Sequence, residues 1–334
     1  MITPIETPWE PNLWRKELQQ ALRNTQELLA YVGVHVDNAS DQDPFPVRVP
    51  RGFADRMQRG NPDDPLLRQV LATREESIDA PGFVKDPLME QSPNNAIHPA
   101  PGLLHKYQGR ALLIATGACA INCRYCFRRH FPYAEHQQKR HEQALEALRQ
   151  DNSIEEIILS GGDPLLLDDD YLEQLLNALA AITHLQRLRI HTRIPVVLPS
   201  RVTHGLTKML ASTRLQVVVV IHSNHAQELD AATARALGAL DTANVRLLNQ
   251  AVLLRGVNDN LLTQTNLAKK LFEQRVLPYY LHLPDKVAGT RHFYVDDRRA
   301  QQLHRDMQAQ LPGYLVAKLV REQAGEPNKT IVSR

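Results

Sequence analysis

The sequence predicts an α/β fold in which six β-then-α units form a parallel sheet that curls into a partial barrel. Six apolar, strand-like runs follow one another through the last two thirds of the chain, and helical patterns such as DDYLEQLLNALAAI separate them. Six units fall short of the eight that close a full barrel, and a doubly wound open sheet is the alternative. The predicted strands cover residues 111–117, 154–162, 185–193, 215–223, 245–254 and 277–284.

The N-terminal part of the chain, residues 1–104, lacks this alternation and is expected to be mainly helical. Residues 13–32 predict one helix, and FADRMQRG and PLLRQVLATREES predict shorter helical pieces. The proline-rich run SPNNAIHPAPG then separates this region from the strands. We therefore expect two parts, residues 1–104 and residues 105–334.

Charge and hydropathy limit the classes of partner. The chain has 39 Lys and Arg against 37 Asp and Glu, so its net charge is +2 and no overall field favours nucleic acid. The longest apolar run, VVVVI, is too short to cross a bilayer, and the N-terminus lacks the basic and apolar stretches of a signal peptide. With its few cysteines gathered in one place, the chain is expected in the reducing cytoplasm.

Polar motifs follow the predicted strands in order. Because the carboxyl ends of parallel strands meet at one edge of a sheet, and ligands bind there in barrels and in open sheets, these motifs predict a shared site. The motifs are GACAINCRYC after the first strand, SGGDP after the second, HTR at the third, IHSNH at the fourth, NQ within the fifth and LPD at the sixth.

All three cysteines of the chain, Cys119, Cys123 and Cys126, lie in the first of these motifs. Iron–sulfur clusters are held by cysteine thiolates, and a four-iron cluster with three protein ligands leaves one iron open. A structural zinc ion with His130 as fourth ligand is the alternative, and it would fit a nucleic-acid-binding module. The near-neutral charge and the aromatic content of 5% argue against such a module.

The CxxxCxxC spacing directly after a strand resembles the signature of the radical S-adenosylmethionine (SAM) superfamily. Further segments resemble the lysine 2,3-aminomutase family, from about residue 95 to the C-terminus. They are HKYQGRALLIATGACAINCRYCFRR, LSGGDPLLL, RIHTRIPVVLPSRVT, NQAVLLRGVND and PYYLH followed by Asp285. The resemblance implies a partial (β/α)6 radical SAM barrel and an isomerase that converts L-α-lysine to (R)-β-lysine. It also implies a 4Fe-4S cluster, SAM, and pyridoxal 5′-phosphate (PLP) carried by a lysine in a short C-terminal segment.

The resemblance assigns roles to individual residues of this chain. Lys329 is implied to carry PLP, with Lys318 as the rival lysine. Cys119, Cys123 and Cys126 are implied to hold the cluster, and Arg128, Asp285 and Glu322 to bind the substrate. Cofactor contacts are implied for Lys106, Tyr107, Gly161, Gly162, His222 and Gln250. Arg110 is a further candidate anion partner, Asp163 and Arg201 are site candidates without a role, and His191 and Arg193 are expected in the site wall.

Glu322 marks a departure from the family, whose lysine enzymes hold the distal ammonium of lysine with two aspartates. Asp285 matches one of them and Glu322 stands at the place of the other, so slow turnover of free lysine is expected. The chain also lacks the cysteine-rich tail of the larger lysine-degrading enzymes. It resembles the bacterial branch that makes (R)-β-lysine for elongation factor P, which implies a separate ligase and an electron donor as functional partners.

An aminomutase for another amino acid, such as glutamate, is the remaining alternative. Asp285 and Glu322 argue against it, because two carboxylates repel an acidic side chain.

Overall fold

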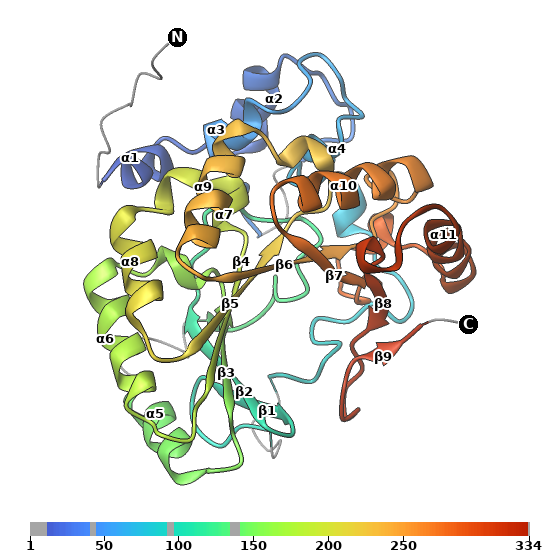
Figure 1. Cartoon of the computed structure of the whole chain (residues 1–334). Helices are drawn as coiled ribbons and strands as arrows, with labels where there is room; N and C mark the ends of the chain where they lie inside the picture. The colour runs from blue at the N-terminus through green and yellow to red at the C-terminus, as the bar shows by residue number, and fades with distance from the viewer. Residues whose placement is uncertain (1–11, 41–44, 92–96, 134–140, 333–334) are drawn as a thin grey trace.

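The computed structural model describes residues 12–40, 45–91, 97–133 and 141–332, and one nine-stranded sheet lies at its centre (Figure 1). The strands follow one another in chain order from β1 to β9. β2 to β8 are parallel neighbours, whereas β1 and β9 are antiparallel to β2 and β8. The strands are β1 (Leu103–Tyr107), β2 (Arg110–Thr116), β3 (Glu156–Gly161), β4 (Arg187–Thr192), β5 (Gln216–His222), β6 (Arg246–Val252), β7 (Leu277–His282), β8 (Lys318–Arg321) and β9 (Thr330–Ile331).

The six strands predicted from the sequence are confirmed as β2 to β7, with boundaries that differ by a few residues. β1, β8 and β9 were not among the six predicted strands. In the part of the chain that the structure describes, β1 and β9 are the two edges of the sheet and do not pair with each other, so the barrel is open. The partial barrel is therefore confirmed.

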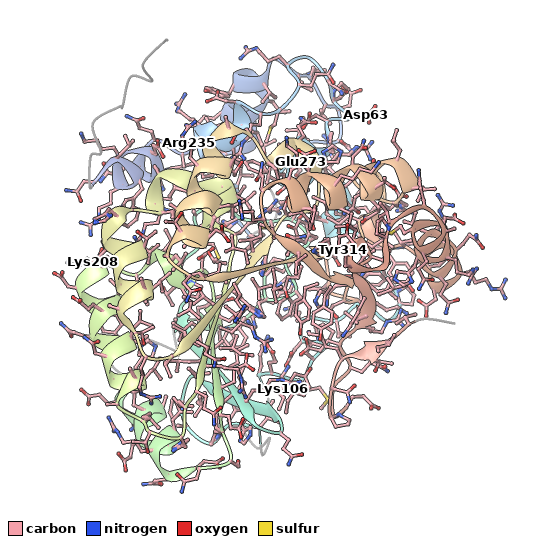
Figure 2. The ribbon with its side chains drawn as sticks, in the orientation of Figure 1. Asp63, Lys106, Lys208, Arg235, Glu273 and Tyr314 are labelled. Atoms are coloured by element: carbon pink, nitrogen blue, oxygen red, sulfur yellow. The ribbon has the colours of Figure 1, made fainter. Side chains whose placement is uncertain are left out.

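Helices cover the outer face of the sheet, and Figure 1 shows α5, α6, α8 and α9 side by side along it. α6 buries four leucines at helical spacing, Leu172, Leu175, Leu176 and Leu179, which places one apolar stripe on the sheet. The larger helices are α5 (His141–Gln150), α6 (Asp169–Ala180), α8 (His204–Ser212), α9 (Ala231–Thr242), α10 (Leu261–Glu273) and α11 (Asp297–Gln310). In Figure 2, Lys208 and Arg235 lie on this outer helical side, whereas Lys106 lies beside β1.

The N-terminal region contains several short helices, but the prediction of one helix over residues 13–32 was wrong. The structure has α1 (Leu13–Gln19) and α2 (Thr25–Val32) instead. Between them Leu22 exchanges two backbone hydrogen bonds with Val49, at 2.8 and 2.9 Å, and the Asn24 side chain caps α2. A tertiary pairing and a cap residue therefore end the first helix, although the apolar pattern continues through it.

Of the shorter helical pieces, FADRMQRG overlaps α3 (Arg51–Ala54) only at Phe53 and Ala54, so most of it is not helical. PLLRQVLATREES contains α4 (Pro65–Arg68) and a 3-10 helix at Arg74–Ser77. A further short helix, α7 (Ile194–Val197), follows β4. Trp14, Phe53 and Leu67 belong to the same hydrophobic core as the strands, so this region packs on the barrel. The division between residues 104 and 105 stays a prediction. Among the described helices none has the length and apolarity that a membrane crossing requires.

Candidate active site

A cavity of about 560 Å³ lies where the carboxyl ends of the parallel strands meet. The residues to which the sequence assigned a cofactor or substrate contact all line this cavity. They are Lys106, Tyr107, Cys119, Cys123, Cys126, Arg128, Gly161, Gly162, His222, Gln250, Asp285, Glu322 and Lys329, and Arg110, Asp163, His191 and Arg193 line it as well.

Arg201 and Lys318 lie elsewhere. The guanidinium of Arg201 is buried outside the cavity and donates to the carbonyl oxygens of Leu165 (2.7 Å) and Leu167 (3.0 Å), so it anchors the loop after β3. Lys318 is exposed at the start of β8. Of the two candidate coenzyme lysines, only Lys329 borders the cavity.

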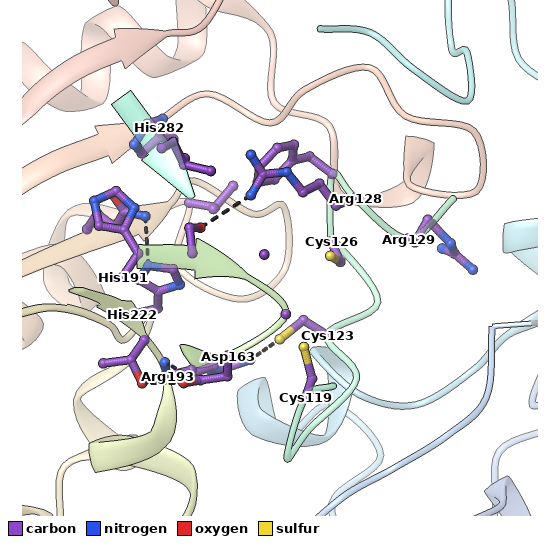
Figure 3. A pocket seen from close by; sticks show the side chains of 18 of the residues that line it. Cys119, Cys123, Cys126, Arg128, Arg129, Asp163, His191, Arg193, His222 and His282 are labelled. Atoms are coloured by element: carbon purple, nitrogen blue, oxygen red, sulfur yellow. Dashed lines mark hydrogen bonds between the residues drawn. The ribbon is translucent and has the colours of Figure 1, made fainter. Parts of the chain in front are cut away.

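The three cysteines occupy the loop after β2, and their sulfur atoms gather on one side of the cavity (Figure 3). The N-terminal region holds this loop in place. Arg48 donates to the carbonyl oxygen of Cys119 (3.1 Å), and the backbone N–H of Arg124 donates to the carbonyl oxygen of Gln69 (2.8 Å). Glu76, which the sequence analysis did not identify, pairs with the buried Arg124 and Arg129 on either side of Cys126.

The environment of the thiols suits a metal cluster. Burial raises the pKa of Cys119 and raises that of Cys126 to about 11, and in both cases a neighbouring thiol adds to the effect. Such thiols ionise when a cationic centre compensates their charge. Arg193 supplies one cation, because its Nη1 lies 2.7 Å from the Cys123 sulfur.

A single metal ion fits the site less well. No three His, Cys, Asp or Glu side chains of the described ranges stand close enough to hold one ion between them. The zinc alternative needs His130 as fourth ligand, but His130 does not line the cavity that the cysteines border. Three thiols that are not arranged around a single ion favour the iron–sulfur interpretation.

Gly161 and Gly162 let the end of β3 approach the cysteine loop. Gly161 has a φ of +112°, and a Cβ there would lie 2.6 Å from the carbonyl oxygen of Thr116. A Cβ at Gly162 would collide with the carbonyl group of Ala118. Space for backbone contact therefore accounts for both glycines. Their contact with SAM stays a prediction.

Asp163 ties the end of β3 to the end of β4. Its buried carboxylate accepts hydrogen bonds from the Thr192 hydroxyl (2.7 Å) and the backbone N–H of Arg193 (2.7 Å). Burial raises the pKa of Asp163, and these hydrogen bonds oppose the rise. Asp163 thus positions the strand that carries Arg193.

Three histidines from β4, β5 and β7 form a neutral wall of the cavity. Gln250 donates its amide to Nε2 of His222 at 2.7 Å, so the proton of that imidazole is on Nδ1. Burial lowers the pKa of His222 to about 3, and lowers the pKa values of His191 and His282 as well. Within the described residues, the buried Nε2 atoms of His191 and His282 have no hydrogen-bond partner. These atoms are free to contact a ligand.

Five side chains of alternating charge cross the cavity. Arg128 donates to both oxygens of Glu90, from Nε at 2.7 Å and from Nη2 at 3.0 Å. Lys106 bridges Glu90 (2.7 Å) and Glu322 (3.1 Å), and Nζ of Lys329 lies 2.5 Å from the second oxygen of Glu322. Although burial opposes it, the ammonium groups of Lys329 and Lys106 lower the pKa of Glu322.

Asp285 also lines the cavity, and among the described residues it forms no ion pair. Burial, with Glu322 adding to it, raises the pKa of Asp285 to about 7. The carboxylate therefore favours a ligand that brings a positive charge.

Arg110 is a cationic side chain that lines the cavity. Its guanidinium lies over the Tyr107 ring, 4.7 Å from the ring centre, and no carboxylate of the described residues pairs with it. An anionic group such as a phosphate would find an available partner there.

The chain is similar to known proteins over its whole length. Residues 113–221 match the family model described as the radical SAM superfamily. The chain is 48% identical to the L-lysine 2,3-aminomutase of Escherichia coli K12, over 98% of this chain and 96% of that protein. It is 47% identical to the protein of the same name from Haemophilus influenzae, over 96% of each chain. The identity to the L-lysine 2,3-aminomutase of Clostridium subterminale is 32%, over 96% of this chain and 78% of that protein.

Proposed function

This chain belongs to the L-lysine 2,3-aminomutase family of the radical SAM superfamily, and we propose that it converts L-α-lysine to (R)-β-lysine by moving the amino group from C2 to C3. One observation supports this most. An arginine for a carboxylate, an acidic pair for an ammonium, a lysine for PLP and three thiols for a cluster border the same cavity. A substrate with lysine's two charged ends could contact all of them.

The proposal includes a 4Fe-4S cluster, SAM and PLP as cofactors. When bound, they supply radical chemistry and a conjugated ring over which an unpaired electron spreads. Cys119, Cys123 and Cys126 would hold the cluster. SAM would contact Gly161, Gly162, His222 and Gln250, and PLP would contact Lys106, Tyr107 and Arg110.

Lys329 would hold PLP covalently through Nζ. Its ion pair with Glu322 must open first, because the attacking nitrogen needs its lone pair. Arg110 is better placed than Lys106 to receive the phosphate, since Lys106 already contacts two carboxylates.

The substrate would lie with its α-carboxylate at Arg128 and its distal ammonium at Asp285 and Glu322. An ammonium beside Asp285 would hold that carboxyl in its ionised form, so binding should release a proton near neutral pH. Glu322 would have to share its carboxylate with Lys106 and Lys329. The neutral imidazoles of His191, His222 and His282 would keep the wall polar without adding charge.

A functional context follows from the family resemblance. We propose that the product supplies β-lysine for modification of elongation factor P by a separate ligase, that an electron donor reduces the cluster, and that the protein works in the cytoplasm. The three cysteines are free thiols in the structure, as a reducing compartment requires. Neither a nucleic acid nor a membrane is a proposed partner.

An anaerobic assay with SAM, PLP and dithionite tests the activity. We expect β-lysine from L-lysine, and no product when any cofactor is left out. The same assay with glutamate tests the alternative substrate. Formation of β-glutamate in place of β-lysine would overturn the proposal, and stoichiometric zinc without iron would overturn the cofactor assignment. The factor P role predicts that cells without this protein lose the β-lysyl modification in an intact-mass measurement.

A further inference from the structure

Glu90 is a buried acidic residue that the sequence analysis did not single out and to which the proposed function gives no role. Its side chain is only 4% exposed, although residues 78–91 form neither a helix nor a strand of the sheet. Its carboxylate contacts both Arg128 and Lys106. An irregular segment has therefore placed a charge inside the cavity wall.

The backbone around Glu90 directs the Glu90 side chain toward the cavity. Asp86 accepts hydrogen bonds from the backbone N–H groups of Glu90 (3.0 Å) and Gln91 (2.8 Å). Met89 has a φ of +54°, a conformation that residues other than glycine rarely adopt. The Met89 side chain is 56% exposed, whereas the adjacent Glu90 is buried. The turn thus gives the two neighbours opposite directions.

The same segment is joined to the loop after β7. Val84 donates to the carbonyl oxygen of Lys286 (3.0 Å) and accepts from the backbone N–H of Ala288 (2.9 Å). Lys286, which makes the first of these bonds, directly follows Asp285. Glu90 is therefore carried by a segment that is fixed to the cavity rim at a second point.

Glu90 contacts one of the two edges by which the Arg128 guanidinium can bind a carboxylate. A guanidinium can receive a carboxylate on its Nε/Nη2 edge or on its Nη1/Nη2 edge. Glu90 occupies the first edge. On the second edge, Nη1 makes one long hydrogen bond, 3.3 Å, to the hydroxyl of Ser160, which also lines the cavity. Figure 3 shows the Arg128 side chain on the same side of the site as Cys126.

We propose that Glu90 is the positioning residue of the substrate-carboxylate subsite, where it holds Arg128 by one edge and leaves the other edge to the α-carboxylate of the substrate. This inference rests on the proposed function, which requires a substrate with an α-carboxylate. Lys106 contributes by holding Oε1 of Glu90 at 2.7 Å, which limits rotation of that carboxylate.

The net charge of the row of five side chains that contains Glu90 is consistent with this positioning role. The row Arg128, Glu90, Lys106, Glu322 and Lys329 has three cations and two anions, so it carries one positive charge in excess. One substrate carboxylate would neutralise it. A substrate that displaced Glu90 would instead leave a buried carboxylate with Lys106 as its remaining cation, which is unfavourable.

Two ligands, lysine and lysinamide, distinguish binding at the carboxylate subsite from binding in the rest of the cavity. Lysine and lysinamide share both amino groups, but only lysine has a carboxylate. We would measure both dissociation constants by calorimetry on anaerobically prepared protein loaded with cluster and PLP. SAM and reductant are left out, so no turnover occurs. Wild type should prefer lysine.

The Glu90→Gln variant should bind lysine about ten- to hundredfold more weakly, because one charge-assisted contact loses its alignment. Its affinity for lysinamide should change less than about threefold, well below the effect of losing such a contact. Glu90→Asp keeps the charge and should give an intermediate loss for lysine. Gln91→Ala is the matched control, since Gln91 lies in the same turn but is exposed. It should leave both affinities unchanged.

Three results would overturn the inference. Equal weakening for both ligands would make Glu90 a structural residue. Tighter lysine binding by Glu90→Gln would mean that Glu90 competes with the substrate for Arg128. A wild type that binds lysinamide as well as lysine would remove the carboxylate subsite, and with it the part of the proposed function on which Glu90 depends. Iron content and far-UV circular dichroism of each variant identify a failure to fold.

Discussion

Nζ of Lys329 lies 2.5 Å from Oε2 of Glu322, so the lysine proposed to carry PLP is paired with a carboxylate proposed to bind the substrate. If PLP passed from Lys329 to the substrate, as proposed, Lys329 would compete with the distal ammonium for the same carboxylate. Asp285, which forms no ion pair with another described residue, would then be the more available acid. The two acidic residues of the cavity are therefore not equivalent.

Lys329→Ala should remove the visible absorbance of covalently held PLP and abolish amino migration, because the attachment atom is lost. Cluster assembly should survive, since the cysteines lie on the loop after β2. Lys318→Ala is the control, because that lysine is exposed and outside the cavity. Absorbance spectra and iron analysis of both variants check this. Loss of the absorbance in Lys318→Ala alone would show that the wrong lysine was chosen.

Cys119→Ala, Cys123→Ala and Cys126→Ala should each lose the 4Fe-4S cluster and the cleavage of SAM, because the sequence contains no fourth cysteine to replace a ligand. Iron and sulfide contents and the electron paramagnetic resonance signal of the reduced protein are the measurements. A fully assembled cluster in any one of the variants would contradict the assignment.

Gly162→Ala should destabilise the junction between β3 and the cysteine loop, because the new Cβ would meet the carbonyl group of Ala118. We expect a loss of about 1–3 kcal/mol in the free energy of unfolding and a lower iron content. Gly238→Ala is the control. Gly238 lies inside α9, where an added Cβ would have no neighbour within 4 Å. Alanine there should stabilise by about 0.5–1 kcal/mol. Equal unfolding midpoints for the two variants would contradict this account.

The parts of the molecule that the sequence predicted depend on local patterns. Strands β2 to β7 were found because each is a short apolar run, and a shared site was predicted because polar motifs follow those runs. The roles of Lys106, Glu322 and Lys329 came from the family resemblance instead. The break after α1 was missed because it depends on the pairing of Leu22 with Val49, which no local pattern shows.

The same limit applies to individual site residues. Glu90 contacts the cavity only because residues 78–91 fold over it, and no motif around Glu90 marks this. Arg201 was a site candidate without an assigned role. In the structure its Nε and Nη2 donate to carbonyl oxygens of the loop after β3, and Nη2 also pairs with Asp169. A buried cation that completes a loop and one that binds a ligand have the same sequence signature.

Asp285→Asn should change the pH dependence of stability. Burial raises the pKa of Asp285 from an unfolded value of 3.8 to about 7, so the folded protein binds a proton that the unfolded chain releases. The stability from this group is complete below pH 4 and is lost as the pH rises through 7. Between pH 5 and 8, the free energy of unfolding of wild type without cofactors should therefore fall by roughly 1–3 kcal/mol more than that of the variant. Urea unfolding at both pH values measures this, and parallel pH profiles would contradict it.

The same variant should lose turnover of lysine while it keeps its cofactors. Without the carboxylate of Asp285 the distal ammonium would have only Glu322, which already contacts two cations. An ammonium left without its partner in a buried site costs roughly 3–5 kcal/mol. PLP absorbance and iron content should match wild type while β-lysine formation falls. Unchanged activity would remove Asp285 from the substrate site.

Glu322→Asp should turn over free lysine faster than wild type, and Glu322→Gln should turn it over more slowly. The glutamate side chain is long enough to place one oxygen at Lys106 and the other at Lys329, so the substrate would have to share either oxygen with a lysine. An aspartate has a shorter reach and cannot bridge both ammonium groups, which leaves one oxygen for the distal ammonium of lysine. A misplacement of about 1 Å can cost on the order of a hundredfold in rate, so even a partial correction should be measurable. Glutamine keeps the length but removes the charge that attracts the ammonium. Counting β-lysine formed in anaerobic assays of the three proteins decides between these roles. A slower Glu322→Asp together with an unaffected Glu322→Gln would mean that Glu322 serves Lys106 and Lys329 alone, and that Asp285 binds the ammonium without it.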